Sequence, residues 1–243
     1  MGDLGDVYEG TRSSIVELVR HHANQFDLPV PATPEWRVRD VVSHLVGDVE
    51  CILRGDFPSE FFRSFGHAAA ILELNEWTQS HLEARRNRSL DEIVAEWDEL
   101  TPPLVSMMRT ETEWPDGVPP FADRVIVTDL GVHQQDIFGA FGVKRDHDGP
   151  TVKIGSAAYI AALDLRLRAE GRGALAIEAP GKRWVVGGDE PSATVRTDRF
   201  ELFRALSGRR SLDQLRSYDW DGDPEPFLGC FYPYGLREES LIE

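Results

Sequence analysis

The chain has 243 residues, and its 42 acidic side chains outnumber its 26 basic ones, which gives a formal net charge of −16. Nucleic-acid phosphates and anionic membrane surfaces are bound by clustered lysines and arginines, so this charge excludes both as expected partners. Residues 1–150 hold 13 basic and 27 acidic residues, so most of the net charge belongs to the first part of the chain. This asymmetry predicts two domains, the first with a strongly acidic, solvated surface.

Other features of the sequence predict a cytoplasmic protein. Residues 1–6 contain neither a basic region nor an apolar run, so we do not expect a signal peptide there. No uncharged apolar stretch reaches the roughly 18 residues that a membrane-spanning helix requires. Cys51 and Cys230 lie far apart in the sequence and are expected to stay reduced. The sequence leaves open whether the protein is a monomer or a homodimer.

Hydrophobic residues recur with helical spacing through the first 145 residues. The pattern predicts helices over residues 7–25, 35–53, 69–86, 90–109 and 120–141, with an aromatic-rich loop or short helix over 57–65. Thr33 is expected to cap the second of these helices, with Pro34 at its first helical position. Ser89 and Glu92 have the spacing of a capping box for the fourth. Long helices joined by short pieces predict a helix bundle over residues 1–145.

The pattern changes after residues 146–150, a polar and turn-rich segment that we expect to be a linker. Helices are predicted over 152–170 and 199–206, and strands over 174–179, 183–186 and 193–197. Helices and strands in this order over about 90 residues are typical of a small α+β domain. The predicted fold class is therefore α+β, with a four-helix bundle followed by an α+β domain over residues 151–243.

Asp129 and His133 lie four residues apart on the last predicted helix of the bundle. This spacing places both side chains on one helix face, which Ile126 and Ile137 extend toward the bundle core. A carboxylate and an imidazole that point inward are costly unless they pair with each other or bind a metal ion. The sequence leaves both readings open for this pair, a buried Asp–His hydrogen bond and a metal site.

His44 lies in the apolar stripe of the second predicted helix and would supply a third ligand from a facing helix. Three protein ligands leave a coordination position open for water or substrate, as in catalytic metal sites. Two imidazoles and a carboxylate suit zinc, with non-haem iron or nickel as alternatives. Asp48 and Asp136 are candidates to orient the imidazoles. The other histidines, His81 among them, are expected on the surface.

Three segments of the chain resemble the mycothiol-dependent maleylpyruvate isomerase family of actinobacteria. The sequence TPEWRVRDVVSHL at residues 33–45 is similar to the opening motif of that family, and DLGVHQQDI at residues 129–137 is similar to its second motif. GRRS at residues 208–211, followed by WDGDP at 220–224, is similar to its C-terminal segment. The resemblance covers nearly the whole chain, with the motifs in the order expected for the family.

The resemblance implies a DinB-like four-helix bundle followed by a sterol-carrier-like α+β domain. It also implies a divalent metal, usually zinc, with ligands at His44, Asp129 and His133. The isomerase itself is expected to carry glutamate where this chain has Asp129, which is one methylene shorter and would bring the metal closer to its helix. Mycothiol is the implied cofactor. Arg209, the candidate catalytic residue, and Arg210 would bind an anionic group of the thiol or of the substrate.

The function implied by the resemblance is that of a metal-dependent enzyme in which a thiol attacks a small electrophilic substrate. A metal cation favours the thiolate, which is the nucleophilic form of the thiol. Addition to a conjugated double bond, rotation and elimination would give cis–trans isomerisation, whereas retention of the adduct would give thiol transfer. A metal-dependent hydrolase and a non-catalytic ligand-binding or regulatory protein with a structural metal are the alternatives.

Overall fold

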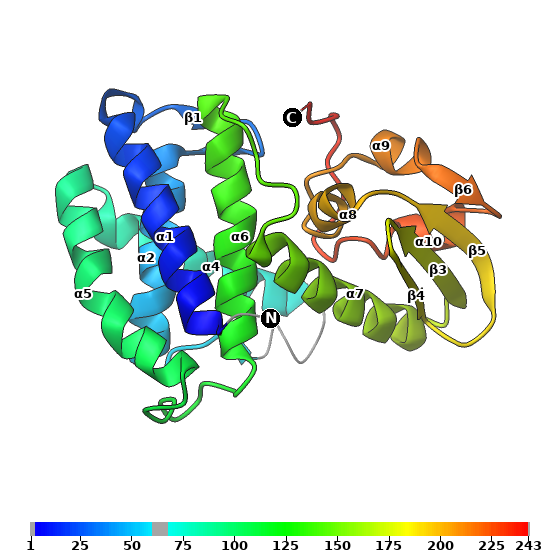
Figure 1. Cartoon of the computed structure of the whole chain (residues 1–243), viewed down its shortest axis with the longest axis horizontal. Coiled ribbons are helices and arrows are strands. Elements are labelled where there is room, and N and C mark those ends of the chain that lie inside the picture. The colour runs from blue at the N-terminus through cyan, green and yellow to red at the C-terminus, as the bar shows by residue number, and fades with distance from the viewer. Residues whose placement is uncertain (1–2, 60–67, 243) are drawn as a thin grey trace. The chain divides into compact units, whose positions relative to one another are not determined.

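The protein is an α+β protein, as predicted, and its chain divides into two compact units, Met1–Arg145 and Asp146–Glu243 (Figure 1). The computed structural model describes residues 3–59 and 68–242. Part of the loop or short helix predicted over 57–65 therefore lies outside the described residues. The two units are taken in turn, each by itself.

The first unit is built from helices arranged around α2. Its long helices are α1 (Leu4–His21), α2 (Val38–Leu53), α4 (Ala68–Arg85), α5 (Leu90–Met108) and α6 (Ala122–Phe141), and a short 3-10 helix, η1, covers Ala23–Gln25. Helix α2 packs against α4, α5 and α6, while α1 packs against α5 and α6. The buried Trp97 indole of α5 donates a hydrogen bond of 2.8 Å to the Tyr8 hydroxyl of α1, which joins two of these helices. Most of α2 is buried, including its polar residues Ser43, His44 and Asp48.

Helix α2 begins later than predicted, because the segment before it is extended. Strands β1 (Pro29–Val30) and β2 (Thr33–Arg37) form an antiparallel hairpin, so the predicted cap at Thr33 and helical start at Pro34 are wrong. The helix starts at Val38, where the Asp40 carboxylate accepts a hydrogen bond of 2.8 Å from the Arg37 backbone N–H. This capping interaction satisfies an N–H that would otherwise lack a partner at the helix start.

The ends of α5 and α6 follow local sequence signals. The predicted capping box at the start of α5 is present, since Ser89 and Glu92 exchange backbone and side-chain hydrogen bonds. Helix α6 ends at Gly142, whose φ of 65° is the left-handed conformation that glycine adopts without steric cost. These two helices therefore have defined boundaries, which fixes the position of the polar residues of α6 relative to the bundle interior.

The second unit is a small four-stranded sheet with helices packed on it. Its elements are α7 (Pro150–Glu170), β3 (Ala174–Ala179), β4 (Lys182–Val186), β5 (Pro191–Arg196), α8 (Arg199–Leu206), α9 (Leu212–Arg216), β6 (Asp219–Asp221) and α10 (Glu225–Leu228). The strand order is β4-β3-β5-β6, in which β3 and β5 are parallel and the other neighbours are antiparallel. Leu167 of α7, Ile177 of β3 and Leu202 of α8 belong to one buried core. The short elements β6, α9 and α10 add to those predicted.

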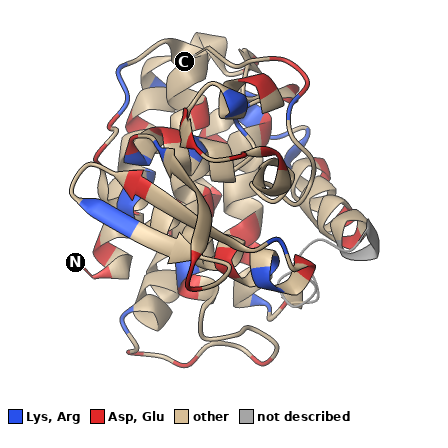
Figure 2. Ribbon diagram, turned by 90° about the vertical axis from the view of Figure 1, so that its right-hand side faces the viewer, with Lys and Arg blue, Asp and Glu red and all other residues tan. Residues whose placement is uncertain are grey.

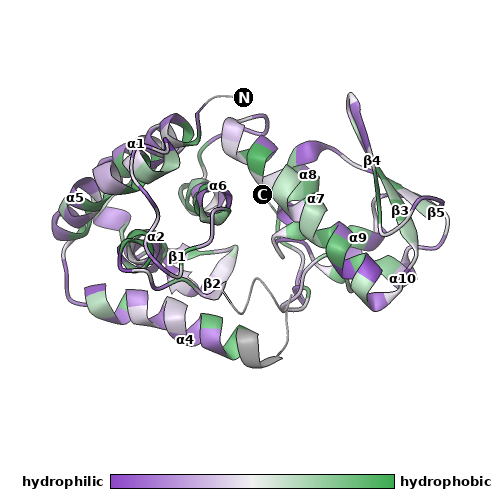
Figure 3. Cartoon of the chain, turned by 90° about the horizontal axis from the view of Figure 1, so that it is seen from below, coloured by the Kyte–Doolittle hydropathy of each residue, from purple (hydrophilic) through white to green (hydrophobic). Residues whose placement is uncertain are grey.

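The long helices carry both hydrophilic and hydrophobic residues (Figure 3). Acidic residues are spread over the helices with basic residues between them (Figure 2). Within the described part of the chain, no helix combines the length and the apolar character that crossing a membrane demands.

Candidate metal centre

The three predicted ligand residues meet in the interior of the first unit. His44 on α2 and His133 on α6 are both buried, and about 31% of the Asp129 side chain is exposed. His44 Nε2 lies 3.2 Å from Asp129 Oδ2, and His133 Nε2 lies 3.7 Å from Asp129 Oδ1. One donor atom from each residue lies within 4.8 Å of the others. Two ligands about 2.1 Å from one tetrahedral metal stand about 3.4 Å apart, so these separations suit a shared metal ion.

The imidazole of His133 is held in the orientation that a metal ligand requires. Its Nδ1 lies 3.0 Å from Oδ2 of Asp136, a carboxylate with no solvent exposure. An Nδ1–H that donates to this carboxylate leaves the lone pair on Nε2, the atom that faces Asp129. The structure therefore places Asp136 where the sequence predicted a residue that orients a ligand.

Asp129 has an unsatisfied oxygen at the centre of the group. Its Oδ2 is buried and has no hydrogen-bond partner, although the Nε2 atom of His44 is near. Burial on its own raises the pKa of Asp129, but the charges of His133 and His44 outweigh burial and hold that pKa below its usual value. An ionised carboxylate between two imidazoles, with one of its oxygens unsatisfied, fits a bound cation, which would supply the missing partner.

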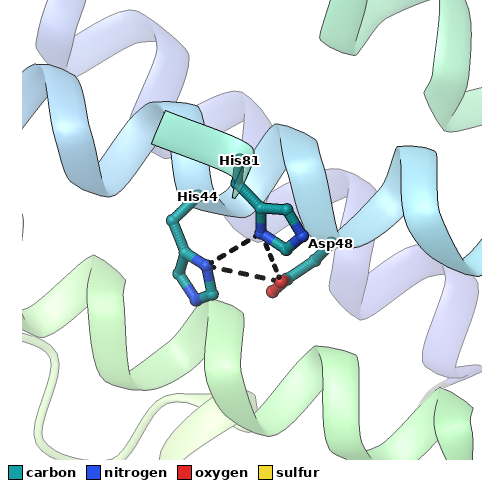
Figure 4. A group of neighbouring side chains, drawn as sticks. All are labelled: His44, Asp48 and His81. Carbon is teal, nitrogen blue, oxygen red and sulfur yellow. Dashed lines mark hydrogen bonds and ion pairs between the residues drawn. The ribbon is translucent and has the colours of Figure 1, made fainter. Parts of the chain in front are cut away.

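The other edge of the His44 ring faces a second group, which contains a histidine that the sequence analysis placed wrongly. His81 of α4 was expected on the surface, but only 1% of it is exposed. Its Nδ1 lies 3.3 Å from His44 Nδ1 and 3.5 Å from Asp48 Oδ1, and His44 Nδ1 lies 3.4 Å from the same oxygen (Figure 4). His44 thus presents Nε2 to one group and Nδ1 to another.

His81 reaches this position because α2 has a glycine opposite it. A Cβ atom on Gly47 would lie 2.2 Å from Cγ of His81, so the imidazole occupies the space that any other side chain would fill. On its far edge, His81 Nε2 lies 3.3 Å from the sulfur of Cys51. Burial first, and then the neighbouring His44, lower the pKa of His81 to about 3, so its imidazole is neutral in the folded protein.

Asp48 is the second buried carboxylate of this region. Burial and the nearby charge of Asp129 hold the pKa of Asp48 well above its usual value. Its Oδ1 has no hydrogen-bond partner, like Oδ2 of Asp129. Two neighbouring carboxylates, one with a raised and one with a lowered pKa, are typical of functional sites.

Two tryptophans pack against the histidines. The Trp36 ring of β2 lies 5.3 Å from the His44 ring and 5.8 Å from the His133 ring, measured between ring centroids. The Trp77 ring of α4 lies 4.2 Å from that of His81. The β1–β2 hairpin, which replaced the predicted helix start, is what brings Trp36 to this place. These rings limit the rotation of the imidazoles and reduce their contact with water.

Arg209 and Arg210, the predicted anion-binding residues, belong to the second unit, and both are buried there. Arg209 Nη1 donates a hydrogen bond of 2.6 Å to the Ser207 carbonyl. Arg210 forms a bidentate ion pair with Glu201, at 2.7 and 2.6 Å. Bidentate pairing orients a guanidinium firmly, so Arg210 has an evident role within its own unit. A role of either arginine toward the thiol or the substrate stays a prediction.

Comparisons with known proteins relate the chain to one family. The sequence pattern of the family described as the mycothiol maleylpyruvate isomerase N-terminal domain matches residues 12–138. The crystal structure of a histidine-to-alanine variant of mycothiol-dependent maleylpyruvate isomerase matches with a TM-score of 0.50 at 12% identity, over 86% of this chain and 92% of that chain. A second crystal structure of mycothiol-dependent maleylpyruvate isomerase matches at 14% identity with a TM-score of 0.47, over the same shares. No curated protein matches the chain. At these identities, the structural likeness concerns the fold alone.

Proposed function

The chain belongs to the family of the mycothiol maleylpyruvate isomerase N-terminal domain, and from that premise we propose that it is a metal-dependent enzyme using a low-molecular-weight thiol. The thiol that the family name supplies is mycothiol, and the substrate class is a small electrophile. The proposed reaction is isomerisation, or transfer of the thiol where the adduct is retained. We propose a cytoplasmic enzyme, in keeping with such a thiol.

One observation carries the proposal, namely that His44 Nε2, His133 Nε2 and the Asp129 carboxylate converge inside the bundle. The unsatisfied Oδ2 of Asp129 supports a cation at this point. Although aspartate is shorter than glutamate, one of its oxygens lies 3.2 Å from His44 Nε2 and the other lies 3.7 Å from His133 Nε2. We propose these three residues as the ligands of a divalent metal. Two imidazole nitrogens and a carboxylate oxygen suit zinc best, and iron or nickel are the alternatives.

A divalent metal bound there would supply a positive charge that favours the thiolate form of a thiol. The protein's own residues prepare the site for it. Asp136 holds the proton of His133 at Nδ1, so that Nε2 keeps its lone pair. Trp36 covers both imidazoles and reduces their contact with water, which strengthens electrostatic interactions inside the site. The partly exposed Asp129 marks the side from which small molecules reach the group.

Arg209 and Arg210 are proposed to bind an anionic group of the thiol or substrate, with Arg209 as the residue that acts in catalysis. Support for this comes from the fork-shaped guanidinium, which matches a carboxylate. Arg210 already pairs with Glu201, so binding through it would require sharing its donors. Substitution of Arg209 by lysine is expected to raise KM for the anionic ligand while the metal content stays unchanged.

Metal analysis tests the first part of the proposal. The purified, untagged protein is loaded with zinc, and its metal content is compared with that of His133→Gln and of His21→Gln, a matched change of an exposed histidine. We expect His133→Gln to lose metal and His21→Gln to keep it. Equal metal content in all three proteins would contradict the assignment of the ligands.

A thiol-dependence assay tests the second part. The zinc-loaded protein is incubated with maleylpyruvate as the probe, with and without mycothiol, and the products are separated by chromatography. Thiol-dependent appearance of the isomer, or of a thiol adduct, is the expected result. Hydrolysis of the probe without thiol would instead support the metal-dependent hydrolase. If the protein turns over no substrate and its bound metal does not exchange, the result would support a binding protein with a structural metal.

A further inference from the structure

His44 Nδ1, Asp48 Oδ1 and His81 Nδ1 form a nearly equilateral triangle. The three separations are 3.3 Å between the two nitrogens, 3.4 Å from His44 to the oxygen and 3.5 Å from His81 to the oxygen (Figure 4). The three residues come from two helices that pack against each other, α2 and α4. None of these three donor atoms belongs to the ligand set proposed above, which uses the opposite nitrogen of His44.

The contact between the two imidazoles is a long hydrogen bond, neither contact to Asp48 Oδ1 is a hydrogen bond, and all three separations suit a metal ion. N–H···O hydrogen bonds have donor–acceptor distances of about 2.7–3.2 Å. His133 and Asp136 show such a bond at 3.0 Å in the same protein. Two ligands about 2.1 Å from a tetrahedral metal stand about 3.4 Å apart, which all three separations match within about 0.1 Å. The three donor atoms are therefore spaced as the ligands of one metal ion would be.

The surroundings of the triangle keep these donor atoms together and away from water. All three side chains are buried, and Asp48 Oδ1 has no hydrogen-bond partner among the described residues, although the Asp48 carboxyl group also interacts with that of Asp129. Gly47 leaves room for the His81 ring against α2, and Trp77 packs on the opposite part of that ring. An unsatisfied carboxylate oxygen costs free energy in such a place, and a cation between the three donors would remove this cost.

We propose that His44, Asp48 and His81 bind a second divalent cation, which shares the His44 imidazole with the first. The site takes a cation that accepts two nitrogens and one carboxylate oxygen in tetrahedral geometry, such as Zn²⁺ or Co²⁺. When both sites are filled, His44 binds through both ring nitrogens, so one proton leaves its ring for solvent. The inference goes beyond the proposed function, because it holds whether or not the protein uses a thiol.

Metal stoichiometry tests the second site. The full-length, untagged chain is stripped with a chelator and titrated with Co²⁺, with the visible absorption of tetrahedral cobalt as the signal. Metal content after Zn²⁺ loading is measured in parallel. We expect two equivalents per chain in the unchanged protein, one in His81→Gln and one in His133→Gln. The double variant is expected to bind none, while the exposed-site control His21→Gln keeps two.

The near-isosteric variant Asp48→Asn provides a second measurement, and it is expected to bind one equivalent. If His81→Gln fails to fold, which circular dichroism would reveal, the metal content of Asp48→Asn tests the second site in its place. The proposal is overturned if the unchanged protein binds one equivalent and Asp48→Asn binds the same amount with the same cobalt spectrum. In that case, loss of the single metal in His133→Gln would still support the proposed function. An anomalous map of zinc-loaded crystals is expected to show one peak on each edge of the His44 ring.

Discussion

The two edges of the His44 ring face different surroundings. On one edge, Asp129 is partly exposed and His133 is oriented by Asp136. On the other, Asp48 and His81 are enclosed between α2 and α4, with Gly47 and Trp77 packed around the imidazole. We call these the open side and the enclosed side. The comparison teaches that one histidine can face a partly exposed carboxylate on one edge and an enclosed group on the other.

The largest expected effect is that of His44→Ala, because it removes the residue that both sides share. We expect metal affinity to fall by at least about 100-fold, since a ligand is lost on each side and not only an orienting contact. Isothermal titration with zinc measures this change, with His21→Ala as the control. An affinity within threefold of the unchanged protein would break the comparison, since neither side would then depend on His44.

Asp136→Asn is expected to weaken the open side alone. The amide cannot accept the His133 proton as strongly as the carboxylate does, so the ring loses its fixed tautomer. Loss of such an orienting contact costs about 10–100-fold in metal affinity. Cobalt titration is expected to show one weakened site and one unchanged site. Equal weakening of both sites would mean that Asp136 acts through overall stability.

Gly47→Ala is expected to disturb the enclosed side alone. The new Cβ would lie 2.2 Å from His81 Cγ, so the imidazole must move away from α2. Overpacking of this kind costs about 1–3 kcal/mol in the free energy of unfolding. Urea denaturation of the metal-free protein measures the cost, with Gly10→Ala as the control, since a Cβ there meets nothing within 4 Å. Retention of the His133-dependent metal would confine the effect to the enclosed side.

The last comparison lengthens each of the two carboxylates by one methylene, and the smallest effect is expected at Asp129. Asp48→Glu adds a carbon within a buried group and is expected to cost about 1–3 kcal/mol of stability. Asp129→Glu lengthens a side chain that is about 31% exposed, so we expect less than half of that cost and metal binding within tenfold. The two unfolding curves are compared directly. A larger cost at Asp129 would reverse the assignment of open and enclosed sides.

Much of the bundle follows from residue spacing, because long amphipathic helices have a strong periodic signal. The segment before α2 was mispredicted since Thr33 followed by Pro34 also suits a helix start. The pairing of β2 with β1, which overrides that preference, depends on contacts outside the segment. The three-residue strand β6 escaped prediction because so short a stretch carries little pattern, and its pairing with β5 defines it.

The two sides of His44 were unequally predictable for a physical reason. Asp129 and His133 lie on one helix at a spacing of four, so their proximity is visible in the sequence. His81 is brought to His44 by the packing of α4 on α2, which local sequence does not encode. Helix α4 also lacks a clear apolar stripe, so its inward face was not recognised. The available signal was the recurrence of Trp77, His81 and Arg85 at intervals of four residues.

Gly47 has a consequence for how this chain is to be compared with its relatives. Because the His81 ring occupies the volume beside Gly47, these two positions cannot vary independently. A relative with a side chain at position 47 must place the residue at position 81 differently or replace it, whereas its open-side residues can persist. We therefore expect a glycine at position 47 to accompany a histidine at position 81 in those relatives that use both edges of the shared ring.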